Sequence, residues 1–290
     1  MGGSISGHHA VEIRPTAFGR TALLIGRISR VSDGGEGSRA VRVTFIGHAT
    51  VLIEQCGVRV LTDPVLRNRI GPLIRTSPLP DLTLGRLDAV LISHLHRDHF
   101  DVPTLRGLGR GIRLIVPPGA GHFAHRLGFR TVSELRPGDT EEVGGLTVSA
   151  VPAHHDGHRS PLGARAECVG YLTQGSARVY FAGDTALYQE MVDLAPGLDI
   201  ALLPVWGWGP TLGDGHLGPH EAARALRLLR PRMAIPIHWG TLRPLGMRRL
   251  MGSHLSDPPG EFARLAALLT PDVEVRILAP GDALTVNGVQ

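Results

Sequence analysis

The chain is poor in several residue types, and each shortage narrows what it can be. It contains no lysine, so all 30 basic residues are arginine, which a compositional bias of the genome explains more simply than a function does. Only Cys56 and Cys168 are present, and we predict two buried thiols rather than a disulfide. Aromatic residues make up 4%, so the stacking platforms typical of single-strand nucleic-acid binders are scarce.

Long apolar runs are also missing. No stretch approaches the roughly 18 to 20 residues of a membrane-spanning helix, and the N-terminus lacks the charged start and apolar core of a secretory signal. We therefore expect a cytoplasmic protein without a transmembrane segment. The net charge of +4 and the pI of about 9.8 would suit a nucleic-acid partner, but the arginines alternate with Asp and Glu and form no basic block. Charge therefore indicates at most a mild preference for anionic substrates, and it leaves the oligomeric state open.

The 290 residues, 42% of them hydrophobic, suffice for a large core. Residues 1–40 contain Gly and Ser clusters, notably at 32–38, which predict a partly mobile N-terminal extension. A single domain is predicted over 41–290.

Short β-branched runs dominate both halves of this domain. Residues 41–46, 50–54 and 58–62 predict antiparallel strands separated by glycines. Further strands are predicted at 88–93, 112–116, 146–151, 168–173, 178–182, 200–204, 233–237 and 273–278. Helices are predicted near 101–109, 118–128, 219–230 and 262–269, the last two from apolar residues at helical spacing. Two β-rich halves, each followed by helices, predict two sheets packed face to face with helices outside.

The most informative motif is His94-Leu95-His96-Arg97-Asp98-His99, directly after the apolar run 87–93. His94 and His96 are two apart, so an extended backbone directs both rings to the same side. Asp98 and His99 follow where the chain can turn over a second ion. The spacing suits two neighbouring metals.

Three further motifs follow predicted strands in the same way. His154 and His155 follow the strand that ends at Val151, Asp184 follows Gly183, and His238 follows Ile237. A carboxylate such as Asp184 has two oxygens and can bridge two ions, whereas an imidazole cannot. From the residues alone, His154 and His155 are alternatives.

This ordered series resembles the metallo-β-lactamase superfamily, whose fold is an α/β (α+β) four-layer αββα sandwich with a dinuclear site at one edge. The likeness covers roughly residues 41–285. The segments Phe45–Glu54, Leu61–Pro64, Leu91–His94 and His216–Ala222 are similar to the group that contains N-acyl phosphatidylethanolamine phospholipase D and L-ascorbate-6-phosphate lactonase. His220 stands where the phospholipase pattern has Glu.

The resemblance implies a set of metal ligands. The first metal would be bound by His94, His96 and His155, the second by Asp98, His99 and His238, and Asp184 would bridge them. His155 is preferred to His154 because the family ligand is the last residue of the matching motif.

The resemblance also implies roles beside the metals. Asp98 is a candidate to hold the attacking water and relay its proton, Asp63 aligns with a carboxylate that supports a ligand, and His216 is a candidate for substrate contact. His48 is placed near the pocket, with a hydrogen-bonded loop histidine as the alternative. Trp206 and Trp208 lie in a Gly-rich loop and predict either a substrate wall or a cap on the core.

Segment 66–80 is apolar and basic. It predicts either a rim that attracts phosphate through Arg67, Arg69 or Arg75, or an ordinary surface loop.

The functional expectation is a dinuclear metal-dependent hydrolase in which a metal-bridging hydroxide attacks a phosphodiester or a lactone or other ester. The cofactors expected are two divalent ions, zinc first because the ligands are mainly imidazoles, with manganese or iron compatible. The expected partner is a small-molecule or lipid-like ester, anionic in some cases. The alternatives are a nucleic-acid-processing metallohydrolase and a non-catalytic binding module on the same fold.

Overall fold

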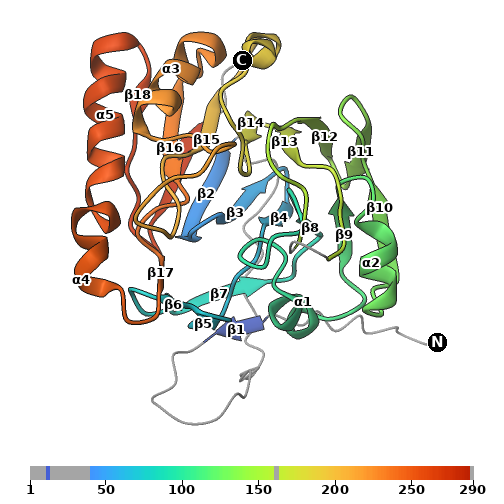
Figure 1. Ribbon diagram of the computed structural model, residues 1–290. Coiled ribbons are helices and arrows are strands. Elements are labelled where there is room, and N and C mark those ends of the chain that lie inside the picture. Colours follow the sequence, from blue (N-terminus) through green and yellow to red (C-terminus); the bar gives the residue numbers. More distant parts are fainter. Residues whose placement is uncertain (1–10, 14–39, 160–162, 288–290) are drawn as a thin grey trace, which may run out of the picture.

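The computed structural model describes residues 11–13, 40–159 and 163–287. Its framework is two mixed seven-stranded sheets (Figure 1). The first sheet has the order β10-β9-β8-β4-β3-β2-β19, antiparallel from β19 to β4 and parallel from β4 to β10. Its strands are β2 (Ala40–Gly47), β3 (Thr50–Gln55), β4 (Val58–Thr62), β8 (Ala89–Leu91), β9 (Arg113–Val116), β10 (Thr131–Glu134) and β19 (Ala283–Asn287).

The second sheet has the order β11-β12-β13-β14-β15-β16-β18, antiparallel from β11 to β14 and parallel from β14 onward. Its strands are β11 (Thr140–Val143), β12 (Leu146–Pro152), β13 (Val169–Gln174), β14 (Arg178–Phe181), β15 (Ile200–Pro204), β16 (Met233–Ile237) and β18 (Glu274–Val275). Strands β12, β14, β15 and β16 therefore run in one direction, and their C-terminal ends meet at one edge.

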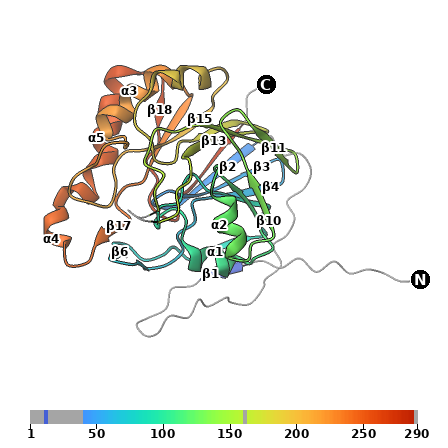
Figure 2. The same ribbon diagram turned by 45° about the vertical axis from the view of Figure 1, so that its right-hand side comes forward.

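Three apolar layers hold the four-layer sandwich together. The central layer lies between the sheets and includes Phe45, Val60 and Tyr171, all fully buried. The second lies between the second sheet and the helices α3 (Pro219–Leu229) and α5 (Asp257–Leu269), and it also covers η1 (Gln189–Leu194). The third lies beneath α1 (Val102–Leu108) and α2 (Gly121–Arg126) on the first sheet. The two views show these helix pairs on opposite outer faces (Figures 1 and 2).

Smaller elements surround the lower end of the sandwich in Figure 1. A three-stranded sheet joins β17 (Leu242–Pro244), β6 (Leu73–Arg75) and β5 (Arg69–Ile70), and β1 (Val11–Ile13) pairs with β7 (Leu82–Gly85). The short helices α4 (Arg248–Met251) and η2 (Gly252–Leu255) follow β17.

The predicted αββα sandwich is confirmed, as is the antiparallel order of β2, β3 and β4. The predicted strand 273–278 is wrong in extent, because only Glu274–Val275 pairs with β16 and the chain then crosses to the first sheet as β19. Helix α5 begins at Asp257, before its apolar stripe, because Pro258 and Pro259 suit the first turn of a helix. The predictions for residues 1–40 fall outside the described residues except at 11–13 and 40.

Both cysteines are free thiols, as predicted, but only Cys168 is buried while Cys56 is exposed. Within the described part of the chain, no helix has the length and apolar character needed to cross a membrane.

Candidate metal centre

The loops after β8, β12, β14 and β16 converge at one edge of the sandwich. They bring the predicted ligands into a single group of side chains, which we call the ligand cluster: His94, His96, Asp98, His99, His155, Asp184 and His238. Gly183 makes the approach of two loops possible, because its φ is +62° and a Cβ there would lie 2.6 Å from the Cβ of Ser93. The convergence joins the two sheets, since Ser93 follows β8 and Gly183 follows β14.

His94, His96 and His155 form what we call the first group. The Nδ1 atom of His96 lies 2.9 Å from Nε2 of His94 and 3.1 Å from Nε2 of His155. Burial lowers the pKa of all three imidazoles, that of His94 well below its ordinary value. Neutral rings with three nitrogens facing one point are the donor set that a divalent cation requires.

Asp98, His99 and His238 form the second group. The Nε2 atoms of His99 and His238 are 3.1 Å apart, and Nε2 of His99 is 3.7 Å from Oδ2 of Asp98. Burial lowers the pKa of His238 to about 3. Burial alone would also lower the pKa of His99, but the carboxylates around that ring outweigh it and raise its pKa well above the ordinary value.

Asp184 is close to both groups. Its Oδ1 is 3.2 Å from Nε2 of His238 and its Oδ2 is 3.2 Å from Nε2 of His99, both in the second group. One of its oxygens also lies within 4.8 Å of a ring nitrogen of His155 in the first group. Burial would raise the pKa of this carboxyl group, but His238 and His99 hold it well below its usual range. The side chain is therefore a buried carboxylate with an imidazole at each oxygen.

One atom tests whether the cluster fits a cation. Although Nε2 of His238 lies 3.2 Å away, the buried Oδ1 of Asp184 has no hydrogen-bond partner among the described residues. Leaving an ionised oxygen buried without such a partner is costly. A divalent cation held by Asp184 and the imidazole nitrogens around it would satisfy this oxygen. The donor set of nitrogens and carboxylate oxygens suits zinc, with manganese or iron compatible.

Outer contacts orient the rings. Nδ1 of His99 lies 2.7 Å from Oδ2 of Asp63, a fully buried carboxylate that also accepts a hydrogen bond from the backbone N–H of Ser93. Nδ1 of His238 lies 2.7 Å from the carbonyl oxygen of Trp206. When each Nδ1 donates to these oxygens, each Nε2 keeps its lone pair toward the cluster.

Three residues of the site have left-handed backbone conformations, with φ of +57° for His48, +33° for Asp63 and +62° for His238. Residues other than glycine adopt this conformation at a cost, and such strain concentrates at functional sites. His48 is 1% exposed, and its Nε2 lies 2.9 Å from Oδ2 of Asp98. The structure therefore places His48 inside the site, against a candidate ligand, and its role as a substrate contact stays a prediction.

His155 and His154 have separate surroundings. His155 points into the first group, and its Nδ1 lies 2.9 Å from the carbonyl oxygen of Gly215. His154 is exposed and stacks on Tyr188 with ring centroids 4.6 Å apart. The structure thus brings the preferred histidine into the cluster and leaves its neighbour outside.

His216 completes the ring of polar groups around Asp184. Its Nε2 is 3.6 Å from Oδ2 of Asp184, and its side chain is 23% exposed. It can therefore reach both the cluster and a molecule above it, as expected of a substrate contact.

The two tryptophans of the Gly-rich loop, Trp206 and Trp208, have different surroundings. Trp206 is half-buried and stacks on His254 with centroids 4.9 Å apart and nearly parallel planes, whereas Trp208 is 41% exposed. Trp206 therefore packs against the protein while its carbonyl supports His238, and Trp208 is the one free to meet a substrate.

Two of the arginines predicted for an anion-attracting rim have other partners, so that expectation is wrong for them. Arg67 forms a paired contact with Asp101 at 2.8 and 2.9 Å, which ties it to the cap of α1. Arg75 is buried behind Gly47 and directs one nitrogen toward backbone carbonyls. Arg69 is exposed, so only it keeps the predicted freedom.

Sequence reasoning missed two supporting residues. The hydroxyl of Ser93 lies between Asp63 and Nδ1 of His94. Arg159 donates to the carbonyl oxygens of Leu95 and Phe100, at 2.7 and 3.1 Å, on the two sides of the His96–His99 turn. Ser93 could have been suspected because it precedes the first histidine, but no pattern in the sequence connects Arg159 with that turn.

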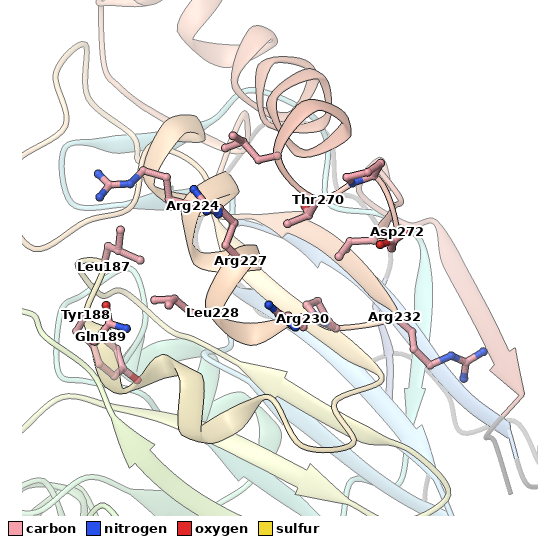
Figure 3. A pocket seen from close by; sticks show the side chains of 14 residues that line it. Leu187, Tyr188, Gln189, Arg224, Arg227, Leu228, Arg230, Arg232, Thr270 and Asp272 are labelled. Carbon is pink, nitrogen blue, oxygen red and sulfur yellow. The ribbon is translucent and has the colours of Figure 1, made fainter.

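Two cavities differ in their relation to the cluster. One of about 640 Å³ borders it, lined by His155 together with Arg165, Glu167 and Cys168. The other, of about 990 Å³, lies between α3, the start of η1 and the end of α5, and none of the candidate ligands lines it (Figure 3). Of these two cavities, the first alone is lined by a residue of the ligand cluster.

Comparisons with known proteins agree with this geometry. Residues 58–239 match the model of the beta-lactamase superfamily domain. A UPF0173 metal-dependent hydrolase from Methanopyrus kandleri is 35% identical over 252 residues, covering 84% of this chain and 99% of the relative. An N-acyl-phosphatidylethanolamine-hydrolyzing phospholipase D from Caenorhabditis elegans is 32% identical over 230 residues, covering 70% of this chain and 64% of the relative.

A solved metallo hydrolase from Ignicoccus hospitalis superposes with a TM-score of 0.66 at 23% identity, covering 85% of this chain and 98% of that one. At this identity the superposition supports the fold alone.

Proposed function

Because the chain belongs to the metallo-β-lactamase superfamily and is one of its metal-dependent hydrolases, we propose that it holds two divalent cations and cleaves a phosphodiester or a lactone or other ester. The observation that carries this proposal is the position of Asp184. It is a buried carboxylate that contacts His99 and His238 of the second group and lies within 4.8 Å of His155 of the first, and one of its oxygens has no hydrogen-bond partner among the described residues. A single ion would leave one of the two groups without a function.

The first group would hold one cation and the second group the other, with Asp184 shared between them. Zinc fits the imidazole-rich donor set best. When bound, such ions lower the pKa of water toward neutrality and polarise the oxygen of an ester.

The remaining chemistry belongs to side chains of this protein. Asp98 contacts His48 through Oδ2, and its side chain is 11% exposed. We assign to Asp98 the role of orienting an attacking water and accepting its proton. We assign to His216, whose Nε2 lies 3.6 Å from Oδ2 of Asp184, the role of donating a hydrogen bond to the substrate.

The class of ester is the finer part of the proposal. The similarity to a phospholipase D relative supports a phosphodiester, while the motifs shared with lactonases support an ester of a carboxylic acid. The half-open cavity beside His155 carries both Arg165 and Glu167, so its charge favours neither class.

The test combines metal content with hydrolysis. Protein purified without chelator is analysed for metals and assayed with bis(p-nitrophenyl) phosphate and a panel of lactones. We expect about two equivalents of metal and one active substrate class. Asp184→Asn should lose metal and lose more activity than the roughly 10- to 100-fold effect of removing an outer hydrogen-bond partner.

Asp156→Asn is the matched control, because Asp156 is an exposed carboxylate next to His155 whose side chain pairs with His158 and with no candidate ligand within the described part of the chain. It should retain metal and activity. Wild-type protein that binds no metal and stays inactive after addition of zinc or manganese would refute the proposal.

A further inference from the structure

Beside the metal centre, the chain presents large apolar side chains to solvent. Residues 243–250, which we call the rim segment, connect β17 to α4. Within it, Leu245 is 59% exposed and Leu250 is 71% exposed. These two are among the three most exposed large hydrophobic side chains of the described residues, and they belong to one short segment.

The rim segment is held in place and does not depend on a partner for its shape. The backbone N–H of Leu245 donates to the carbonyl of Pro72, and that of Leu250 donates to the carbonyl of Met247. Met251, which follows directly, is fully buried. The two leucines are therefore displayed by an anchored turn.

Charge indicates what the rim segment contacts. Residues 239–256 contain three arginines, Arg243, Arg248 and Arg249, and no Asp or Glu. Arg248 and Arg249 are exposed, and no ion pair is formed by either within the described part of the chain. Aliphatic side chains flanked by unpaired cations match a surface that is anionic outside and apolar beneath, which is the interface of a bilayer with acidic lipids.

The rim segment also lies at the same end of the molecule as the metal centre. Shortly after it, His254 stacks on Trp206, whose carbonyl oxygen supports His238. Trp208, exposed by 41%, belongs to the same loop as Trp206. A surface contacted by Leu245 and Leu250 would therefore lie next to the entrance of the ligand cluster.

Other exposed apolar residues lack this combination of charge and position. Leu269, at the end of α5, is 40% exposed and lies beside Arg224, Arg227 and Arg230, but none of the candidate ligands lines that cavity (Figure 3). Val192 in η1 is 46% exposed, and its neighbours in the same short helix include Glu190 and Asp193. Val192 is therefore an exposed aliphatic side chain in an acidic setting.

We infer that the rim segment docks the protein on anionic lipid surfaces, with Leu245 and Leu250 entering the interface and Arg248 and Arg249 contacting the acidic headgroups. Docking itself does not need hydrolysis. It deepens the proposed function only by placing the metal centre at a bilayer surface, where an ester substrate carried in the membrane would meet it.

The test is flotation of the full-length, metal-loaded protein with vesicles of phosphatidylcholine alone or mixed with phosphatidylglycerol. Wild-type protein should bind the mixed vesicles at least tenfold more strongly, and added salt should weaken the binding. Leu245→Ser with Leu250→Ser should lower binding about tenfold or more. Arg248→Gln with Arg249→Gln should remove the preference for phosphatidylglycerol.

The control is Val192→Ser, which changes an exposed aliphatic residue in an acidic setting and should bind as wild type does. Circular dichroism and a thermal melt verify that each variant is folded. Wild-type protein that binds neither kind of vesicle, or a control variant that loses as much binding as the rim pair, would overturn the inference.

A second readout separates this inference from the hydrolase proposal. The rim variants should hydrolyse soluble substrates and retain metal as wild type does, whereas Asp184→Asn should lose hydrolysis and still float with the vesicles. Loss of soluble activity in all rim variants would show that the segment shapes the metal centre instead, and would overturn docking as its role.

Discussion

The two groups of candidate ligands have the same chemistry but different surroundings. In the second group, Asp98, His99 and His238 are each less than a tenth exposed. Asp63 holds the far nitrogen of His99, and the carbonyl of Trp206 holds that of His238. In the first group, His96 and His155 are half-buried, and His155 also lines the cavity of about 640 Å³.

The difference shows how one edge of a sandwich can provide two unequal sites. The rings of the first group also have outer partners, Ser93 for His94 and the carbonyl of Gly215 for His155, so the two groups differ in burial rather than in orientation. The first group meets the open side, so it is the part of the cluster closest to an incoming substrate. We therefore expect the second group to retain its metal more firmly than the first.

The largest expected effect comes from removing one ligand of the first group while leaving the second group intact. His155→Ala should leave about one equivalent of metal in the second group and lower hydrolysis by more than about 100-fold, because outer partners alone account for 10- to 100-fold. Elemental analysis with the assay of the proposed substrate measures both. His154→Ala, which removes the exposed neighbour, should keep both metals, and the reverse pattern would contradict the assignment.

The next largest effect comes from removing an outer hydrogen-bond partner of the second group, which should weaken metal binding there. Asp63→Asn removes the negative charge that holds Nδ1 of His99 and should weaken one of the two metals by about 10- to 100-fold. Competition with a chromophoric chelator resolves the two affinities. Asp101→Asn is the control, because this buried aspartate caps α1 and pairs with Arg67 without contacting a ligand. Asp63 also reaches His94 through the Ser93 hydroxyl, so a smaller weakening of the other metal is expected, and unchanged affinity for both metals would contradict the prediction.

A smaller effect should reach both groups together. Arg159 holds the carbonyls of Leu95 and Phe100 and lies over the rings of Phe100 and Phe123. Arg159→Ala should lower the free energy of unfolding by about 1 to 2 kcal/mol, measured with urea, because two hydrogen bonds from a partly exposed cation are lost. Arg130→Ala, an exposed arginine, should leave stability unchanged. An unchanged free energy of unfolding in Arg159→Ala would contradict this role for Arg159.

The smallest effect concerns the Gly-rich loop that contains Trp208, in which the carbonyl of Trp206 holds His238 of the second group. Trp208→Ala should raise KM a few-fold with kcat unchanged, since an exposed side chain that contacts substrate contributes about 1 kcal/mol of binding. Steady-state kinetics on the proposed substrate measures this. Ile277→Ala, which truncates another exposed apolar residue, should change neither constant, and an unchanged KM in Trp208→Ala would remove that residue from the substrate wall.

Sequence reasoning was most successful where local patterns carry the information. The strand runs and the ligand motif were predicted because alternation and spacing are local properties. It was least successful at the ends of the fold, where β18 is short and β19 crosses to the other sheet. Pairing between Leu284 and Val43 joins residues at opposite ends of the chain, and no local pattern encodes such a partner.

Within the site, the sequence by itself determined the kinds of donor and their order along the chain, because each follows the end of a recognisable strand. Only the tertiary structure decided that His155 enters the cluster while His154 stacks on Tyr188, and that His48 is buried against Asp98. It also decided which oxygens orient His99 and His238. These outcomes depend on left-handed backbone turns and on contacts between residues far apart in the chain, such as Asp63 with His99 and Trp206 with His238. Packing sets such contacts, and the order of residues does not.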